Sequence, residues 1–433
     1  MSELKSHLRE IGGGAMVAFA MKALSFAATF LLSVVVARLL GAESAGLFFL
    51  SLTIVTIATT LTRLGLDKPL VRHVAGFDAT ADRESIRGLV AVCLLMVAIA
   101  ASLTAIGIGA SADRLAVTVF SKPQLAESLR AMAWSITPLA LAGVISLAYQ
   151  GLRQIASHLL LFTAVTPTLV LVLIAINEMT RLQVPIALLY SLGCGVTLAA
   201  AIAAWFPVWG WPQRLPRRSA IEPFLASSRV TLVAIAAQLL MLWAPTVLLG
   251  VFSSSEEVAR FHAAGRTAPL IGFVLIAINS IAAPKFAALY ATGRLAVLEQ
   301  TARQTTRIMT LTSLPITAVF MIWPERILTL FGSDFAPGAE LLQILATGQF
   351  VNTVTGSVAN LLLMTGHERD YRNICLLGAA LGVAAGVLAI PWFGAIGAAW
   401  VTAGTLVLIN LLAAAVVNRR LGFTGIGWFS SDR

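Results

Sequence analysis

Long apolar runs alternate along the whole chain with short segments that are rich in charge, proline or glycine. A helix needs about 20 apolar residues to cross the hydrocarbon core of a bilayer, and most of the runs have about this length. The strands of a membrane β-barrel would alternate apolar and polar residues instead. The pattern therefore predicts an all-α polytopic membrane protein with about twelve transmembrane helices. We expect these helices at residues 12–37, 46–65, 88–110, 131–150, 159–176, 185–207, 230–252, 267–290, 308–323, 340–364, 373–391 and 396–417.

The composition of the 433 residues agrees with this prediction, because 58% are apolar and only 12% are charged. Soluble domains contain about 25% charged residues, which keep their surfaces in solution. With about half that share of charged residues, the chain is not expected to contain a large soluble domain on either side of the membrane. The first apolar run is also longer than the core of a secretory signal peptide, so we expect it to remain as a span.

The basic residues are distributed unevenly between alternate loops. With the N-terminus placed in the cytoplasm, 21 of the 30 Lys and Arg residues fall in cytoplasmic segments and 8 in external segments, while Lys22 lies within a span. An excess of Lys and Arg marks the cytoplasmic side of a membrane protein. The distribution predicts that both termini are cytoplasmic. It also explains the net charge of +10 without a nucleic-acid partner.

The two halves of the chain share a spaced set of short motifs. Leu-Leu-Gly ends the first predicted span at 39–41 and the seventh at 248–250, and prolines close the second and eighth spans. The spacing predicts two six-helix lobes in the same orientation, an N-terminal lobe at 1–215 and a C-terminal lobe at 216–433. Transporters with such repeats bind substrate between the lobes near the middle of the membrane, and the lobes rock to give alternating access. The alternative is a duplicated scaffold with no transport role.

Polar side chains recur on one face of several predicted spans. A charged side chain at the membrane centre costs about 2.5–3.5 kcal/mol on insertion scales, so it faces protein or water. Ser25, Thr29 and Ser33 follow Lys22 at helical spacing, and a stripe of threonines in the second span ends in an arginine and an aspartate. In the tenth span, four polar or small residues between 349 and 360 share one face. We predict a polar substrate cavity lined by Lys22, Arg63, Asp67, Gln238, Asn279, Gln349, Asn352 and Asn360.

Simpler roles are open for most of these residues. Hydroxyl and amide side chains also form hydrogen bonds between packed membrane helices. Arg63 can extend its guanidinium to the membrane interface, or pair with Asp67 one helical turn on. Lys22 is the strongest candidate for a cavity role, because packing alone rarely keeps an ammonium group at that depth.

The remaining motifs add no enzyme chemistry. The three cysteines lie far apart in apolar runs without metal-ligand spacing, and the chain has no Gly-rich phosphate-binding loop. We expect no catalytic residues, no metal site and no cofactor. Gly378, Gly382 and Gly386 predict a ridge for close helix packing. The histidines, including His262, are expected in solvated loops.

Four stretches resemble a known family. They are LLSVVVARLLGAESAGLFFL at 31–50, LTRLGLDKPLVRHVA at 61–75, the segment at 323–373 that begins WPERILTLFGSDFAPGAELLQ, and GAIGAAWVTAGTLVLINLLAAAVVNRRLG at 394–422. They resemble bacterial polysaccharide flippases of the Wzx type, which belong to the multidrug/oligosaccharidyl-lipid/polysaccharide exporter superfamily. The resemblance covers residues 12–422 and implies a MATE-like fold of two six-helix lobes with a cationic cavity.

The resemblance also implies a function and partners. Such a flippase turns an undecaprenyl-diphosphate-linked oligosaccharide from the inner to the outer leaflet of the bacterial inner membrane, for exopolysaccharide, capsule or O-antigen (lipopolysaccharide) synthesis. The expected partners are the lipid-linked oligosaccharide, membrane lipids, and polysaccharide polymerase and chain-length proteins.

Other functions remain as alternatives. A lipid II flippase would be expected to carry several arginines in the first span, and a multidrug exporter a membrane-embedded carboxylate; neither is evident in this sequence. A membrane polymerase or glycosyltransferase acting on the same lipid-linked sugar would need a long external loop. The longest external loop predicted in this sequence, near 111–130, is short for that role. A scaffold that holds glycosyltransferases would need no polar stripe.

Overall fold

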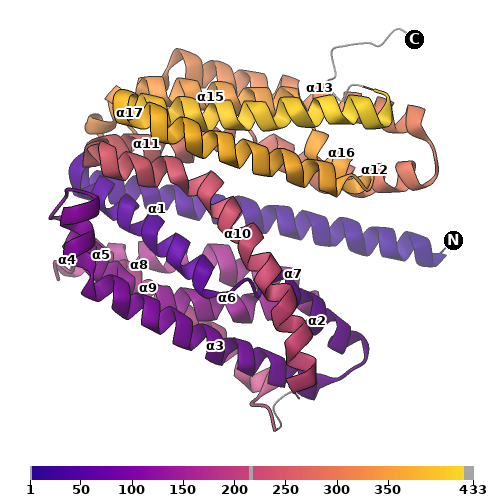
Figure 1. Cartoon of the computed structure of the whole chain (residues 1–433), viewed down its shortest axis with the longest axis horizontal. Coiled ribbons are helices and arrows are strands. Elements are labelled where there is room, and N and C mark those ends of the chain that lie inside the picture. Colours follow the sequence, from indigo (N-terminus) through magenta and orange to yellow (C-terminus); the bar gives the residue numbers. More distant parts are fainter. Residues whose placement is uncertain (1, 214–217, 424–433) are drawn as a thin grey trace. The chain divides into compact units, whose positions relative to one another are not determined.

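A computed structural model describes residues 2–213 and 218–423, and every regular element in these ranges is a helix (Figure 1). The all-α prediction is confirmed. The chain forms two compact units. We name them the N-terminal unit (Ala20–Leu39 and Leu47–Leu239) and the C-terminal unit (Met1–Phe19, Leu40–Gly46 and Leu240–Arg433). The predicted lobes at 1–215 and 216–433, as halves of a repeat, stay a prediction.

Helix α1 (Ser2–Thr62) consists of two helical segments that meet at Gly41. Gly41 has φ 71° and ψ 172°, a backbone conformation that glycine adopts at little cost. Five residues later, Gly46 packs so closely on Ser255 that a Cβ atom would overlap the backbone oxygen of Ser255. The kink falls between the first two predicted spans, where an apolar run alone would give one continuous helix.

Helix α6 is the centre of the N-terminal unit and packs against α2, α3 and α9. A close approach of Gly151 to Val74 and a T-shaped contact between Tyr149 and Trp205 fill the space around it. The elements of this unit after α1 are α2 (Asp67–Ala79), α3 (Arg83–Ala110), α4 (Ala112–Arg114), the π-helix η1 (Leu115–Val119), α5 (Leu125–Ala133), α6 (Ile136–Gly151), α7 (Ile155–Leu159), the π-helix η2 (Leu160–Ala164), α8 (Val165–Thr180), α9 (Ile186–Trp209) and the first part of α10 (Arg218–Phe252).

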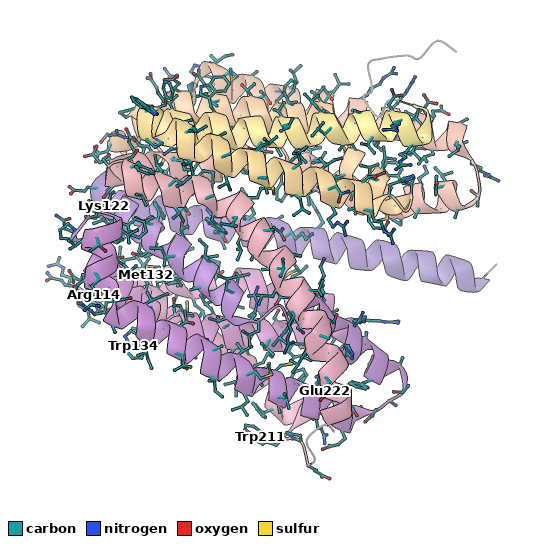
Figure 2. The ribbon with its side chains drawn as sticks, in the orientation of Figure 1. Arg114, Lys122, Met132, Trp134, Trp211 and Glu222 are labelled. Carbon is teal, nitrogen blue, oxygen red and sulfur yellow. The ribbon has the colours of Figure 1, made fainter. Side chains whose placement is uncertain are left out.

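The connecting elements of the N-terminal unit gather at two opposite ends of its helices. Helices α4 and α5 lie at one end, and α2 and α7 at the other (Figure 1). Figure 2 shows Arg114 and Lys122 at the first end and Trp211 and Glu222 at the second. Trp134 and Trp211 expose 67% and 73% of their surface. Exposed tryptophans near helix ends are typical of the boundary between bilayer and water, where one side of the indole is apolar and its N–H is polar.

The C-terminal unit is built around α15, which packs against α11, α13 and α17. Its elements after α10 are α11 (Ser255–Thr267), the 3₁₀ helix η3 (Ala268–Leu270), α12 (Phe273–Ala291), α13 (Leu295–Ile322), α14 (Pro324–Leu328), the 3₁₀ helix η4 (Ser333–Gly338), α15 (Ala339–Val354), α16 (Val358–Met364) and α17 (Glu368–Leu421). A buried cluster that includes Phe286, Leu298 and Val358 joins α12, α13 and α16.

Helix α17 folds back on itself at Gly394, which has φ 53° and ψ −133°. Gly378 lies against Ile409 and Gly382 against Thr405, so the two segments of α17 run antiparallel. A Cβ atom at either glycine would come within 2.7 Å of the opposite side chain. The predicted glycine ridge therefore allows a close approach of two helices, as expected for small residues spaced by four.

Glu257 of α11 supports the turn at Gly394. Its Oε2 atom accepts a hydrogen bond of 3.1 Å from the backbone N–H of Ala395, the first residue of the returning segment of α17. The first N–H groups of a helix have no partner within the helix, and a carboxylate is favoured there by the helix dipole. This carboxylate therefore caps the last predicted span from a neighbouring helix.

Six of the described helices are long and apolar enough to cross a membrane, or seven if α5 and α6, bent by 41°, form one span. The chain is thus a multi-pass membrane protein; the count of twelve spans and the cytoplasmic termini stay predictions. Three predicted spans cross a break between helices: 131–150 between α5 and α6, 267–290 between η3 and α12, and 340–364. The run at 340–364 is not one helix, because α15 and α16 are separated at Thr355–Ser357.

Candidate functional site

Lys22 lies on α1 within the N-terminal unit, with its side chain exposed. Ser25 and Ser33 are buried on the same helix, and each hydroxyl donates to the carbonyl four residues earlier, Met21 and Thr29 respectively. The hydroxyls of the stripe are therefore satisfied by their own helix. Among the described residues, Lys22 has no ion-pair partner, so its ammonium is the group of this stripe that is available to an anion.

Arg63 and Asp67 form a two-pronged ion pair in the N-terminal unit. Nε and one Nη of Arg63 each donate to a different carboxylate oxygen of Asp67 at 3.0 Å. The side chain of Arg63 is only 8% exposed and that of Asp67 is 21% exposed. A parallel pair of N–H···O bonds is among the strongest interactions of arginine. The alternative of an Arg63–Asp67 ion pair is confirmed.

The turn that follows α1 brings the two partners together. Leu64 and Gly65 both have positive φ, of 56° and 71°, so the chain reverses before α2 begins at Asp67. The guanidinium of Arg63 packs on Gly143 of α6, where a Cβ atom would stand 3.3 Å from it. The pair therefore fastens the start of α2 to the centre of the unit, and its charges neutralise each other.

Three predicted residues lie around the break between α15 and α16 in the C-terminal unit. Ser357, in the break, donates its hydroxyl to the side-chain oxygen of Asn279 on α12. Asn352 and Asn360 lie half-buried on either side of the break. Gly356 has φ 74° and lies directly against the hydroxyl of Thr306 on α13. The predicted single face through residues 349–360 is therefore wrong, because the helix does not continue through Gly356.

Gln349 lines a cavity of about 310 Å³ inside the C-terminal unit. The walls come from α10, α11, η3, α15 and the returning segment of α17, and include Trp243, His262, Arg266 and Thr402. His262 is 7% exposed, and the Nε of Arg266 donates to its Nε2 atom at 3.4 Å. The expectation of a solvated His262 was wrong, because α11 buries one face of a segment that reads as a loop.

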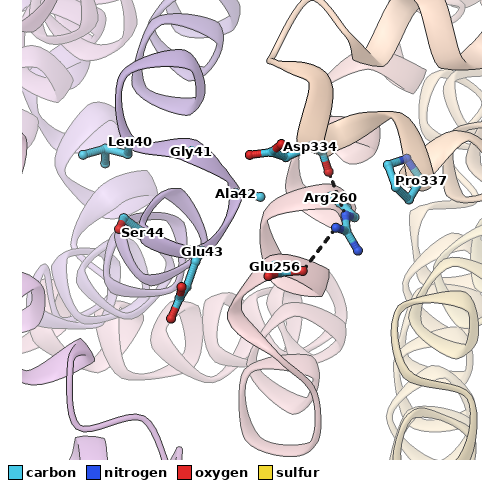
Figure 3. Close-up of a pocket in the computed structure, with 9 residues that line it drawn as sticks. All are labelled: Leu40, Gly41, Ala42, Glu43, Ser44, Glu256, Arg260, Asp334 and Pro337. Carbon is cyan, nitrogen blue, oxygen red and sulfur yellow. Dashed lines mark hydrogen bonds and ion pairs between the residues drawn. The ribbon is translucent and has the colours of Figure 1, made fainter.

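A second hollow of about 550 Å³ lies at the kink of α1, also within the C-terminal unit (Figure 3). Glu43, Glu256 and Asp334 line it together with Arg260. Arg260 donates to Glu256 at 3.1 Å and to the backbone oxygen of Asp334 at 3.0 Å. These contacts connect α11 to η4, and we assign this hollow a structural role.

Comparison with known proteins identifies the family. The family model described as polysaccharide biosynthesis protein matches residues 11–289, which is well over half of the chain. The chain belongs to the polysaccharide biosynthesis protein family. A second family model, described as MatE, matches residues 231–391. No curated protein sequence matches the chain. The resemblance to Wzx-type flippases is thus confirmed at the level of the family.

Several solved structures of membrane transporters have a fold similar to that of this chain. An inward-facing multidrug resistance MATE family transporter of the MOP superfamily aligns with a TM-score of 0.76 at 15% identity, covering 94% of this chain and 98% of that one. The lipid II flippase MurJ, in an inward closed conformation, aligns with a TM-score of 0.72 at 10% identity, covering 93% and 87%. A MOP superfamily transporter from Pyrococcus furiosus Vc1 aligns with a TM-score of 0.64 at 13% identity, covering 95% of both chains.

At these identities the neighbours establish the MATE-like fold of the chain. The family and its structural neighbours are transporters and flippases rather than enzymes, so the polymerase and glycosyltransferase alternatives lose support. The eight predicted cavity residues divide between the two units. Lys22, Arg63, Asp67 and Gln238 belong to the N-terminal unit, where Gln238 is exposed on α10; the other four belong to the C-terminal unit.

Sequence reasoning missed Arg266 and His262, which line the cavity beside Gln349. The sequence predicts both in an external loop, because the segment at 255–267 contains four charged residues among thirteen. A signal was present in the sequence, since Val258, Phe261 and His262 follow one another at helical spacing and all are buried in α11.

Proposed function

We propose that the protein is a flippase that moves an undecaprenyl-diphosphate-linked oligosaccharide across the inner membrane of a bacterium by alternating access. The observation that carries the proposal is the family match over residues 11–289, on a chain whose fold is that of MOP superfamily transporters. The product serves exopolysaccharide, capsule or O-antigen synthesis. We expect polysaccharide polymerase and chain-length proteins to receive it.

In this proposal Lys22 binds the diphosphate of the cargo. Lysine binds phosphate as a compact point charge, and Lys22 is exposed on α1 while the hydroxyls around it are bonded to their own helix. Arg63 and Asp67 act indirectly, because their charges are committed to each other. Gln238, Asn279, Gln349, Asn352 and Asn360 contribute neutral hydrogen-bonding groups for sugar hydroxyls.

Lipid II is the second candidate cargo, because MurJ is among the structural neighbours with a TM-score of 0.72. The family match favours an oligosaccharide for polysaccharide synthesis instead. A drug cargo has weaker support, since the first span carries a lysine and not a carboxylate.

The direct test is deletion of the gene followed by mass analysis of the lipid-linked sugars that remain in the inner leaflet. A flippase defect should leave a complete repeat unit there, because assembly precedes translocation. Accumulation of an incomplete unit would point to a transferase, and accumulation of lipid II would point to the second candidate.

Replacement of Lys22 by Ala should lower translocation at least tenfold, because one charge-assisted contact to phosphate is worth about 1.5–3 kcal/mol. Translocation is measured with purified protein in liposomes that carry a lipid-linked oligosaccharide. Lys68→Ala is the matched control, since Lys68 is also exposed and lies on α2. Normal flipping by inserted Lys22→Ala protein would remove Lys22 from the site.

A further inference from the structure

The two ends of the α17 hairpin carry four arginines. Arg369 and Arg372 lie in the first two turns of α17, and Arg419 and Arg420 lie in its last turn. The Nε of Arg420 donates to Asp370 at 2.8 Å, so the two ends of the helix lie side by side (Figure 1). The four guanidinium groups are thereby gathered at one end of the C-terminal unit.

Apart from Arg420, these arginines have no acidic partner in the described part of the chain. Arg369 and Arg419 form no hydrogen bond or ion pair with any described residue, and Arg372 contacts only the side-chain oxygen of Asn373, at 3.2 Å. All three arginines are exposed. Like charges gathered at one place repel one another, so this end of the unit gains stability from a bound anion.

The arginines border apolar faces of α17 that are exposed. In the first segment, the exposed positions at steps of three or four residues are 369, 372, 376, 380, 384 and 387. Leu376 and Val387 on this face expose 49% and 50% of their surface. In the returning segment, Trp400 and Leu411 are also exposed and precede Arg419. Exposed apolar faces of membrane helices contact lipid, so the arginines lie where the chains of a lipid meet its headgroup.

This combination of charge and apolar surface selects the class of partner. A molecule with an anionic head beside apolar chains matches both parts, whereas an acidic protein segment would match only the arginines. The charges are also spread over two helical segments, with Arg369 and Arg372 on one and Arg419 on the other. The pair of Arg420 and Asp370 lies between these segments. Such a distribution suits several singly charged headgroups rather than one diphosphate.

We propose that the two ends of the α17 hairpin bind anionic phospholipids, whose phosphates contact Arg369, Arg372 and Arg419. Basic residues beside a membrane helix attract anionic lipids of the leaflet that they face. On the predicted orientation, this is the cytoplasmic leaflet. The same arginines contribute to the orientation of the chain, and in addition they bind lipids of one charge class in the folded protein. The site is independent of the cargo and therefore goes beyond the proposed function.

Native mass spectrometry of the purified full-length protein tests the site. The protein is released from micelles that contain equal amounts of phosphatidylglycerol and phosphatidylcholine, and the bound lipids are counted. One basic side chain at a membrane surface contributes about 1 kcal/mol, or about fivefold in affinity, toward an anionic lipid. Wild type should prefer phosphatidylglycerol at least tenfold. The variant Arg369→Gln/Arg372→Gln/Arg419→Gln should lower this preference at least fivefold, whereas lysine at the same three positions should keep it.

The matched control removes the same amount of charge from exposed positions of the N-terminal unit. The variant Lys68→Gln/Arg83→Gln/Arg153→Gln should leave the preference within twofold of wild type. Equal retention of the two lipids by wild type, an unchanged preference in the hairpin variant, or an equal loss in the control would each overturn the proposal.

Farnesyl diphosphate, added as a competitor, distinguishes a phospholipid from the diphosphate of the cargo. It should displace little phosphatidylglycerol at equal concentration. Complete displacement that depends on the three arginines would assign them to the cargo and overturn the proposal. Thermal melting identifies a hairpin variant that fails to fold, and in that case the single variants Arg369→Gln and Arg419→Gln decide, because each should lower the preference and neither residue has a partner to lose among the described residues.

Discussion

Two charged residues of the predicted polar cavity have different environments, and the environment decides what each can do. Lys22 is exposed on α1, whereas Arg63 is buried and bound to Asp67 through both carboxylate oxygens. The sequence predicts both in a polar cavity. The spacing of polar residues along a helix shows which of them share a face, but it does not show what each of them contacts. The turn at Leu64 and Gly65, which creates the pair, depends on backbone conformation that spacing does not report.

Breaking the Arg63–Asp67 pair should destabilise the protein. Removal of one partner of a buried ion pair costs about 3–5 kcal/mol, and the partial exposure of Asp67 favours the lower end, about 3 kcal/mol. Arg63→Met should therefore lower the free energy of unfolding, and the double variant Arg63→Met/Asp67→Leu should recover most of the loss. Denaturant unfolding of the purified protein measures both. Unchanged stability of Arg63→Met together with lost transport would instead place Arg63 at the cargo.

Helices in this chain are interrupted where the apolar pattern is continuous. The predicted boundary between the spans at 12–37 and 46–65 coincides with the kink of α1 at Gly41. The boundary between the spans at 373–391 and 396–417 coincides with the kink of α17 at Gly394. The apolar run at 340–364 predicts one span, yet the helix is interrupted at Gly356. An apolar run indicates that its residues are buried in the bilayer. A helix break within the run does not change this burial, so the break becomes visible only in the contacts of the folded unit.

Gly356→Ala tests whether the break between α15 and α16 is required. The left-handed conformation costs a non-glycine residue about 1–2 kcal/mol, and contact with Thr306 adds an overpacking cost of about 1–3 kcal/mol. We expect a loss of about 3 kcal/mol in the free energy of unfolding, measured by denaturant titration. Gly366→Ala is the matched control, because Gly366 has φ 81° but open space around it, and should cost only the first amount. Equal losses in the two variants would exclude a steric role for Thr306.

The orientation of the whole molecule rests on its basic residues, and it can be tested at three exposed positions. Thr80 and Thr292 lie in segments predicted to be cytoplasmic, and Ser121 in one predicted to be external. Cysteine introduced at Ser121 should react with a membrane-impermeant maleimide in intact spheroplasts, whereas cysteine at Thr80 should react only after lysis. The unmodified protein provides the background, since Cys93 and Cys194 are buried and Cys375 is half-buried.

Thr292 carries the decisive comparison, because it follows α12 in the second half of the chain as Thr80 follows α2 in the first. If each half contains six spans, both halves enter the membrane from the same side, and Thr292→Cys should behave as Thr80→Cys does. An odd number of spans per half would invert the second half, as in transporters with inverted repeats, and would expose Thr292 to the reagent in intact spheroplasts. Labelling of Thr292→Cys before lysis would therefore reject the predicted parallel repeat, and with it the rocking of two like-oriented lobes on which alternating access depends in this proposal.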